Sequence, residues 1–186
     1  MVPITSLWIP ILLSAVIVFI ASSILHMVLT YHRSEYRKLP DEDALLNAMR
    51  ERQIPPGFYA FPHHTGPKEM KSPEMMEKFK KGPVGFVTLI PNGLPAMGKY
   101  LGMWFAFCVL MGVFVAYITG RTVVSGAHYL VVFRIAGTVA FMGYSMGHII
   151  DSIWKGQQWS TTFKHMFDGL VYSLLTGGTF GWLWPR

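Results

Sequence analysis

Four long runs of apolar residues constrain the fold of this chain more than any other feature of its sequence. They cover residues 7–31, 100–119, 129–150 and 166–184. A run of about 20 apolar residues is long enough to cross the hydrocarbon core of a bilayer as a helix, where a helix satisfies its own backbone hydrogen bonds. The sequence therefore predicts an all-α fold, an integral membrane four-helix bundle.

The remaining residues divide the chain into three parts. We expect residues 1–31 to hold the first transmembrane helix, residues 32–99 to form a cytoplasmic or interfacial loop, and residues 100–186 to form a three-helix transmembrane region. Most charged residues lie in the loop, and only 14% of the whole chain is charged, against roughly 25% in soluble domains. The single cysteine, Cys108, lies in an apolar run, which indicates a buried thiol and excludes a disulfide framework.

The long loop contains two short segments with helical patterns. PDEDALLNAMRERQ places acidic residues in its first turn, and SPEMMEKFKK begins with a Ser-Pro pair that favours a helix start. Both segments are amphipathic, and the lysines of the second suit an anionic membrane surface. The stretch between them is rich in Pro, Gly and aromatic residues. The later FVTLI run is too short to span a membrane, so we expect it at the interface or packed under the loop.

The distribution of lysine and arginine predicts the orientation. Eleven of these residues lie in the 32–99 loop and two in the turn at 155–164, whereas Arg121 and Arg186 lie at the other side. The positive-inside rule then places both termini outside and the long loop in the cytoplasm. The net charge of +6 reflects this topology and contact with lipid, because no nucleic-acid-binding motif accompanies it.

Small residues spaced four apart recur in three of the apolar runs. They include Gly143, Gly147, Gly177 and Gly181. Such spacing lets helices approach closely in a membrane, either within one chain or between chains, so these glycines are candidate contacts for a protein partner or lipid. Arg134 lies inside the third run. It could reach the outer headgroups, hold a lipid phosphate or pair with a carboxylate of a partner protein.

The pattern His-x-x-Asp occurs twice around one polar turn, as His148–Asp151 and as His165–Asp168. Residues three apart share one helix face, and His26 near the end of the first run is expected at the same membrane depth. Histidine and carboxylate sets bind zinc, manganese or iron, so these five residues are candidate metal ligands.

Other interpretations of the same residues stay open. Asp168 could complement the dipole at the start of a helix, His165 could be interfacial, and Asp151 could pair with Lys155 four residues later. A haem would need two axial histidines at similar depth, for example His26 and His148. The sequence predicts no cofactor, and a metal ion or a haem is the alternative.

Three segments resemble a group of small bacterial four-helix inner-membrane proteins that have no assigned activity. They are the first run with its continuation YHRSEYRKLPDEDALL, the segment KGPVGFVTLIPNGLPAMGK, and the closing FDGLVYSLLTGGTFGWLWP. The resemblance implies a multi-pass protein of the bacterial inner membrane and carries over no catalytic residue.

Three functions are compatible with these observations. The first is a non-catalytic membrane subunit or accessory protein that binds partner proteins or a second copy of itself, and lipid. The second is a metal- or haem-binding redox or hydrolytic protein with a His/Asp cluster at the cytoplasmic edge. The third is a small oligomeric transporter or channel. Phosphate-binding loops, dinucleotide fingerprints and nucleophile elbows are missing from the sequence, which disfavours a soluble-type enzyme.

Overall fold

The computed structural model describes all residues, 1–186, and the chain is mostly helical, which confirms the all-α prediction. It divides into two compact units. The first combines residues 1–35 with residues 96–186, and the second contains residues 36–95. Each unit is described by itself.

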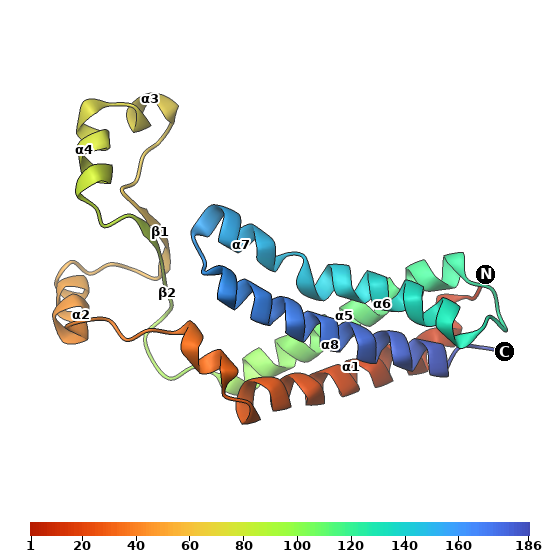
Figure 1. Ribbon diagram of the computed structural model, residues 1–186. Helices are drawn as coiled ribbons and strands as arrows, with labels where there is room; N and C mark the ends of the chain where they lie inside the picture. The colour runs from red at the N-terminus through yellow and green to blue at the C-terminus, as the bar shows by residue number, and fades with distance from the viewer. The chain divides into compact units, whose positions relative to one another are not determined.

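Four long helices lie side by side in the first unit (Figure 1). They are α1 (Trp8–Ser23), α5 (Met97–Thr122), α6 (Tyr129–Ser145) and α8 (Trp159–Trp182). The helix α6 packs most extensively on α8, and α1 packs on both α5 and α8. By length and composition, three continuous helical stretches could cross a membrane: Ile4–Val28, Met97–Thr122 and Tyr129–Lys155.

Shorter elements extend these helices. The turn η1 (Ile4–Leu7) precedes α1, the π-helical turn η2 (Ile24–Val28) follows it, and the 3-10 turn η3 (Tyr31–Glu35) comes next. The third apolar run is expected to form one helix over 129–150. In the structure it forms two helices: α6 ends at Ser145, and α7 follows over His148–Lys155. The fourth run starts its helix at Trp159 rather than at residue 166, because the polar residues before it also accommodate helical turns.

Close contact between α6 and α8 depends on glycine. A Cβ atom added to Gly177 would lie 2.9 Å from the carbonyl oxygen of Phe133 and 3.0 Å from the Cα of Gly137. A Cβ on Gly181 would lie 2.7 Å from the ring of Tyr129. These small residues of α8 therefore meet another helix of the same chain, which is one of the two uses that the spacing predicts.

The other candidate contact residues have different surroundings. Gly143 faces the side chain of Met111 in α5, whereas an added Cβ on Gly147 would meet nothing within 4 Å. Arg134 is exposed on α6 and forms no ion pair or side-chain hydrogen bond.

Both chain termini lie at one end of the four helices (Figure 1). The N–H of Val2 donates to the carbonyl oxygen of Gly120 at 2.8 Å, and the indole N–H of Trp184 donates to the carbonyl oxygen of Val124 at 2.8 Å. These bonds fasten the N-terminus to the last turn of α5 and the C-terminus to the connection between α5 and α6.

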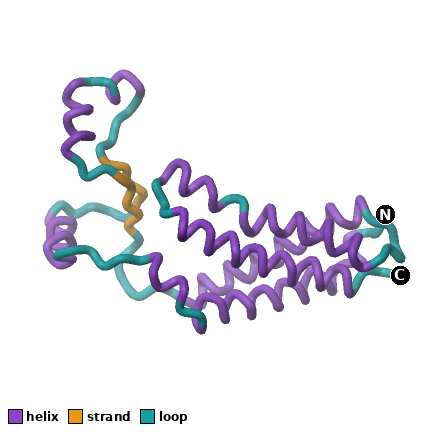
Figure 2. The backbone as a smooth tube through the Cα atoms, in the orientation of Figure 1, coloured by secondary structure: helices purple, strands orange, loops and turns teal.

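The second unit is built around a two-stranded antiparallel hairpin, drawn in orange in Figure 2. The strand β1 (Gly57–Phe61) pairs with β2 (Gly85–Leu89), with Tyr59 opposite Val87. The helices of this unit are α2 (Glu42–Glu51), α3 (Pro67–Met70) and α4 (Pro73–Lys81), and Ser72 caps α4 by accepting a hydrogen bond from the N–H of Met75.

The hairpin adds a feature that the sequence analysis does not predict. Residues Phe86–Leu89 of the FVTLI run form most of β2. Its partner strand comes from the Pro- and aromatic-rich segment before α3. Strand pairing between segments so far apart in the chain leaves only a weak local signal in the sequence.

Candidate metal centre

Two short turns and the helix α8 bring a cluster of histidine and carboxylate side chains together at the end of the first unit. The π-helical turn η2 supplies His26, the 3-10 turn η3 supplies His32, and the first half of α8 supplies His165 and Asp168. One ligand atom from each of these four side chains lies within 4.8 Å of the others, so the group could hold a metal ion. Turns of π-helix occur often at functional sites.

Asp168 is the centre of the cluster and is almost fully buried, with 2% of its surface exposed. The hydroxyl of Tyr31 donates a hydrogen bond to Oδ1 of Asp168. Oδ2 lies 2.8 Å from Nε2 of His32 and 3.8 Å from Nε2 of His26. Neither Oδ2 of Asp168 nor Nε2 of His32 forms an aligned hydrogen bond, although both atoms are buried. Buried polar atoms without a partner are rare in proteins and call for an explanation.

The contacts of Nδ1 in His26 and His32 determine which ring nitrogen remains available to Asp168 or to a metal ion. Nδ1 of His26 lies 3.1 Å from the carbonyl oxygen of Ser22, and Nδ1 of His32 lies 2.5 Å from Oε1 of Glu35. A carbonyl or carboxylate oxygen accepts a hydrogen bond, so Nδ1 carries the proton in both rings. Nε2 of each ring is therefore the nitrogen that faces Oδ2 of Asp168 and could bind a metal ion.

Each of η3 and α8 contributes one histidine that faces a carboxylate of the other element. His32 of η3 faces Asp168 of α8, and His165 of α8 faces Glu35 of η3. Nε2 of His165 lies 3.5 Å from Oε2 of Glu35, and the rings of His165 and His32 are 5.5 Å apart. The side-chain ammonium of Lys164 donates to the carbonyl oxygen of Tyr31 and to the hydroxyl of Ser34, both at 2.6 Å. These bonds hold η3 against α8.

Tyr31 remains a hydrogen-bond donor under ordinary conditions. Burial raises the pKa of its hydroxyl well above the usual value, and the hydrogen bond to Asp168 and the negative charges of Asp168 and Glu35 raise the pKa further. The phenol therefore stays protonated and fixes one oxygen of Asp168, leaving the second oxygen for the histidine side.

The structure separates the five candidate ligands of the sequence analysis. His26, His165 and Asp168 belong to the cluster. His148 stacks on His165 with 4.9 Å between ring centroids but is not one of the four grouped ligands. Asp151 pairs with Lys155 at 2.7 Å, which is the ion pair that the spacing also allowed.

Two residues of the cluster were missed from the sequence. His32 and Glu35 have the spacing His-x-x-Glu, the same three-residue separation as the two His-x-x-Asp pairs. This repeat was the available signal. It was overlooked because the pair follows the first apolar run, in a stretch that the composition assigned to the loop.

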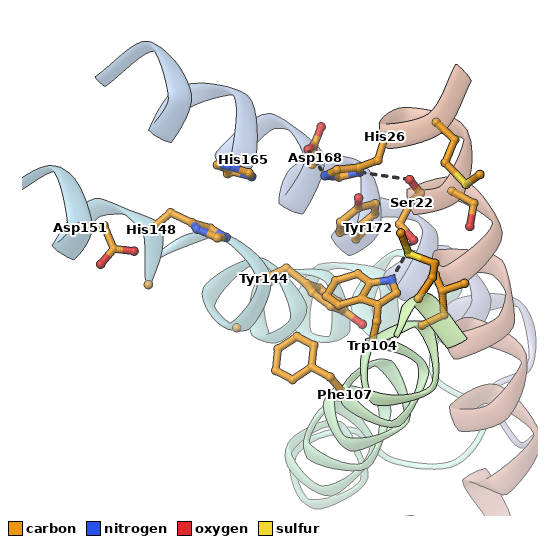
Figure 3. A pocket seen from close by; sticks show the side chains of 16 residues that line it. Ser22, His26, Trp104, Phe107, Tyr144, His148, Asp151, His165, Asp168 and Tyr172 are labelled. Atoms are coloured by element: carbon orange, nitrogen blue, oxygen red, sulfur yellow. Dashed lines mark hydrogen bonds and ion pairs between the residues drawn. The ribbon is translucent and has the colours of Figure 1, made fainter. Parts of the chain in front are cut away.

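A cavity of about 760 Å³ lies beside the cluster, between the ends of the long helices (Figure 3). Its walls are mainly apolar and aromatic, and its polar end includes His26, His148, His165 and Asp168. The indole N–H of Trp104 donates to the hydroxyl of Ser22 at 2.8 Å and so connects α5 to α1.

A haem bound between His26 and His148 fits this geometry less well than a metal ion. Nε2 of His26 is the atom that would bind the haem iron, because Nδ1 contacts the carbonyl oxygen of Ser22. That Nε2 lies 3.8 Å from Asp168 and belongs to the cluster, and the ring of His26 stacks on His32 at 4.2 Å.

Comparisons with protein-family models, curated proteins and solved structures found no match for this chain.

Proposed function

We propose that this protein is an integral membrane metalloprotein that binds one divalent transition-metal ion through His26, His32, His165 and Asp168. The observation that carries the proposal is the buried Oδ2 of Asp168, which lies 2.8 Å and 3.8 Å from the Nε2 atoms of His32 and His26 without an aligned hydrogen bond. A carboxylate oxygen beside histidine nitrogens is stabilised only by a positive charge or a proton between them. A metal ion would supply that charge and satisfy all of these atoms together.

The donor set favours particular metals. Three imidazole nitrogens and one carboxylate oxygen suit zinc, iron(II) or manganese(II). Ligand atoms at about 2.0–2.1 Å from a tetrahedral zinc are about 3.3 Å apart, and the four atoms here lie within 4.8 Å of one another. Small side-chain rotations would therefore complete the coordination.

The contacts around the ligands support the same proposal. Histidine ligands usually donate their second ring N–H to a carboxylate or a backbone carbonyl, which fixes the tautomer and orients the ring. Glu35 serves His32 in this way, and the carbonyl oxygen of Ser22 serves His26. The phenol of Tyr31 fixes the carboxylate ligand.

Access to the metal favours a chemical role over a purely structural one. Structural zinc sites are closed by four protein ligands, whereas catalytic sites keep a position open for water or substrate. With four protein ligands, a chemical role here requires expansion of the metal to a fifth coordination position. The side chain of His26 is 45% exposed, and the cavity reaches three of the four proposed ligands. We therefore favour a metal-dependent redox or hydrolytic activity on a molecule bound in this cavity.

We further propose that α8 crosses the membrane together with the three helical stretches that are long and apolar enough. Its 24 residues suffice for a span, and it packs alongside α6 and α1. With the positive-inside orientation, the metal site lies at the cytoplasmic edge of a bacterial inner membrane and both termini lie outside.

The metal content of the purified protein tests this proposal. We expect about one metal ion per chain in the wild type and in Asp151→Asn, and loss of most metal in Asp168→Asn. Both variants change the carboxylate of a His-x-x-Asp pair to an amide of the same shape, so Asp151→Asn is the matched control. A metal-free wild type after gentle purification, or equal metal in all three proteins, would contradict the proposal.

Partner binding is a second candidate function, favoured by Arg134. Its guanidinium is exposed on the membrane helix α6 without a carboxylate partner in this chain, and an unpaired charge within a span is costly. A carboxylate of a partner protein or a lipid phosphate would neutralise it. Arg134→Leu should weaken co-purification of such a protein in mild detergent, and unchanged recovery of every associated protein would exclude this use.

A further inference from the structure

We propose that the cavity beside the metal centre binds a single-chain fatty carboxylate, with its carboxylate at the metal and its chain between the helices. The inference deepens the proposed function, and it rests on that function because the metal would anchor the head group.

The walls of the cavity suit an aliphatic chain. Trp104, Phe107 and Tyr144 pack against one another, with ring centroids 5.6 to 6.3 Å apart, and form one side (Figure 3). Leu101 and Met97 continue this apolar wall along α5. Burying apolar surface contributes about 25 cal/mol per Å², so a hydrocarbon chain gains free energy along most of its length here.

The opening of the cavity is apolar as well. Met27, Met97 and Leu101 line the cavity and remain exposed, with Met27 at 77%. Exposed apolar side chains at the end of membrane helices favour entry from the lipid over entry from water. A volume of about 760 Å³ lies within the roughly 300–1,000 Å³ that small-molecule sites occupy, which suits one chain and a compact head group and not a two-chain phospholipid.

A buried hydroxyl at the polar end points to an oxygen-bearing head group. Tyr172 is 4% exposed and lines the cavity, and its hydroxyl has no hydrogen-bond partner. Leaving such a group unpaired costs about 1–3 kcal/mol. A ligand oxygen at the metal could accept this hydrogen bond. The unpaired hydroxyl is independent of the histidine geometry that supports the metal.

Charge balance favours an anionic head group. The carboxylates of Asp168 and Glu35 together neutralise a divalent metal ion, and Asp151 is neutralised by Lys155. The ammonium of Lys164 remains uncompensated, because it contacts only the carbonyl oxygen of Tyr31 and the hydroxyl of Ser34. A carboxylate on the ligand would offset this positive charge.

Gly147 offers a way to block the cavity without disturbing the helices. It lines the cavity, and an added Cβ would meet nothing within 4 Å. Its backbone φ is −61°, which any residue can adopt. Gly102 on α5 is equally open to a Cβ but does not line the cavity. The pair Gly147→Leu and Gly102→Leu therefore changes the same residue type inside and outside the proposed site.

Photo-crosslinking with a diazirine-bearing long-chain fatty acid tests the inference. The probe is added to the metal-loaded protein in detergent, labelled residues are mapped by mass spectrometry, and the metal content of each sample is measured. We expect labels on cavity residues of the wild type and of Gly102→Leu. Labelling of Gly147→Leu should fall by at least about 10-fold with its metal retained, since losing 1.4 kcal/mol of binding gives that factor. A fatty alcohol of the same chain should label the wild type about 10-fold less, for the same reason.

The outcomes separate this inference from the proposed function. Labelling that is equal for acid and alcohol, or that is unchanged in Gly147→Leu, overturns the inference while the measured metal still supports the metal centre. Labelling of the cavity that persists after the metal is removed by chelation overturns the anchoring of the carboxylate by the metal. A wild type without metal overturns the proposed function, whatever the probe labels.

Discussion

Asp168 determines the chemistry of the cluster because it is both buried and only half satisfied. Tyr31 donates a hydrogen bond to one carboxylate oxygen, and the second oxygen lies near Nε2 of His32 and of His26 without an aligned hydrogen bond. The ring nitrogens are organised by their outer neighbours, Glu35 and the carbonyl oxygen of Ser22. The residues that contact the proposed ligands therefore orient the atoms that would bind a metal ion.

Glu35 gives the first prediction at the residue scale. In Glu35→Gln the side chain keeps its shape but loses its charge. His32 is then held less firmly, and its Nε2 becomes a weaker ligand for the metal. Replacing such outer partners weakens metal affinity by about 10–100-fold. Competition with a chromophoric chelator measures this affinity. An unchanged affinity would show that Glu35 does not act through His32.

The sequence identified part of this cluster. The two His-x-x-Asp pairs led to His165 and Asp168, because residues three apart on a helix point in one direction. His26 followed from its depth in the first apolar run. His32 and Glu35 could not be placed by depth, since their position depends on a 3-10 turn that folds back against α8.

At the scale of elements, the packing of α6 on α8 is set by backbone contact. Gly177 touches the backbone of Phe133 and Gly137, and backbone cannot move aside without separating the two helices. The neighbouring Gly178 meets only the hydroxyl of Tyr129, at an ordinary 3.6 Å from an added Cβ. An added methyl group would therefore clash with backbone at Gly177 but would fit at Gly178.

This difference gives the second prediction. Gly177→Ala should destabilise the protein by about 1–3 kcal/mol, the usual range for overpacking, whereas Gly178→Ala should change stability little. Thermal unfolding of both variants in the same detergent measures the difference. Equal melting temperatures for Gly177→Ala and the wild type would mean that α6 and α8 are not in backbone contact.

Elements with strong periodicity were predictable and those that depend on distant pairing were not. The amphipathic patterns predicted helices at the positions of α2 and α4, where charge placement and a Ser-Pro start act locally. The hairpin of β1 and β2 was missed, because each strand is five residues long and its partner is remote in the chain. The break between α6 and α7 was also missed, since the apolar pattern continues through it.

At the scale of the whole molecule, hydropathy predicts the membrane helices, and the distribution of lysine and arginine predicts their orientation. Sequence patterns give no information on how the helix ends meet, and the proposed metal centre lies where they meet. Figure 1 shows both termini at one end of the four helices. The chain leaves the first unit after Glu35 and re-enters it at Ala96.

The third prediction concerns orientation. The native Cys108 is buried, with 1% exposed, so an added cysteine is the accessible thiol. Ser125 and Ser160 are both exposed, the first between α5 and α6 and the second at the start of α8. In intact cells, Ser125→Cys should react with a membrane-impermeant maleimide, and Ser160→Cys should react only after permeabilisation. The reverse pattern would contradict the orientation derived from the positive-inside rule.

The metal centre is the central claim, and the X-ray absorption spectrum of the metal-loaded protein tests it most directly. We predict a first shell of nitrogen and oxygen atoms at about 2.0–2.1 Å if the metal is zinc, with outer-shell scattering from three imidazole rings. In His32→Ala, the imidazole signal should fall by one ring or the metal should be lost. A spectrum of a hydrated ion without imidazole scattering, or one unchanged in His32→Ala, would contradict the account.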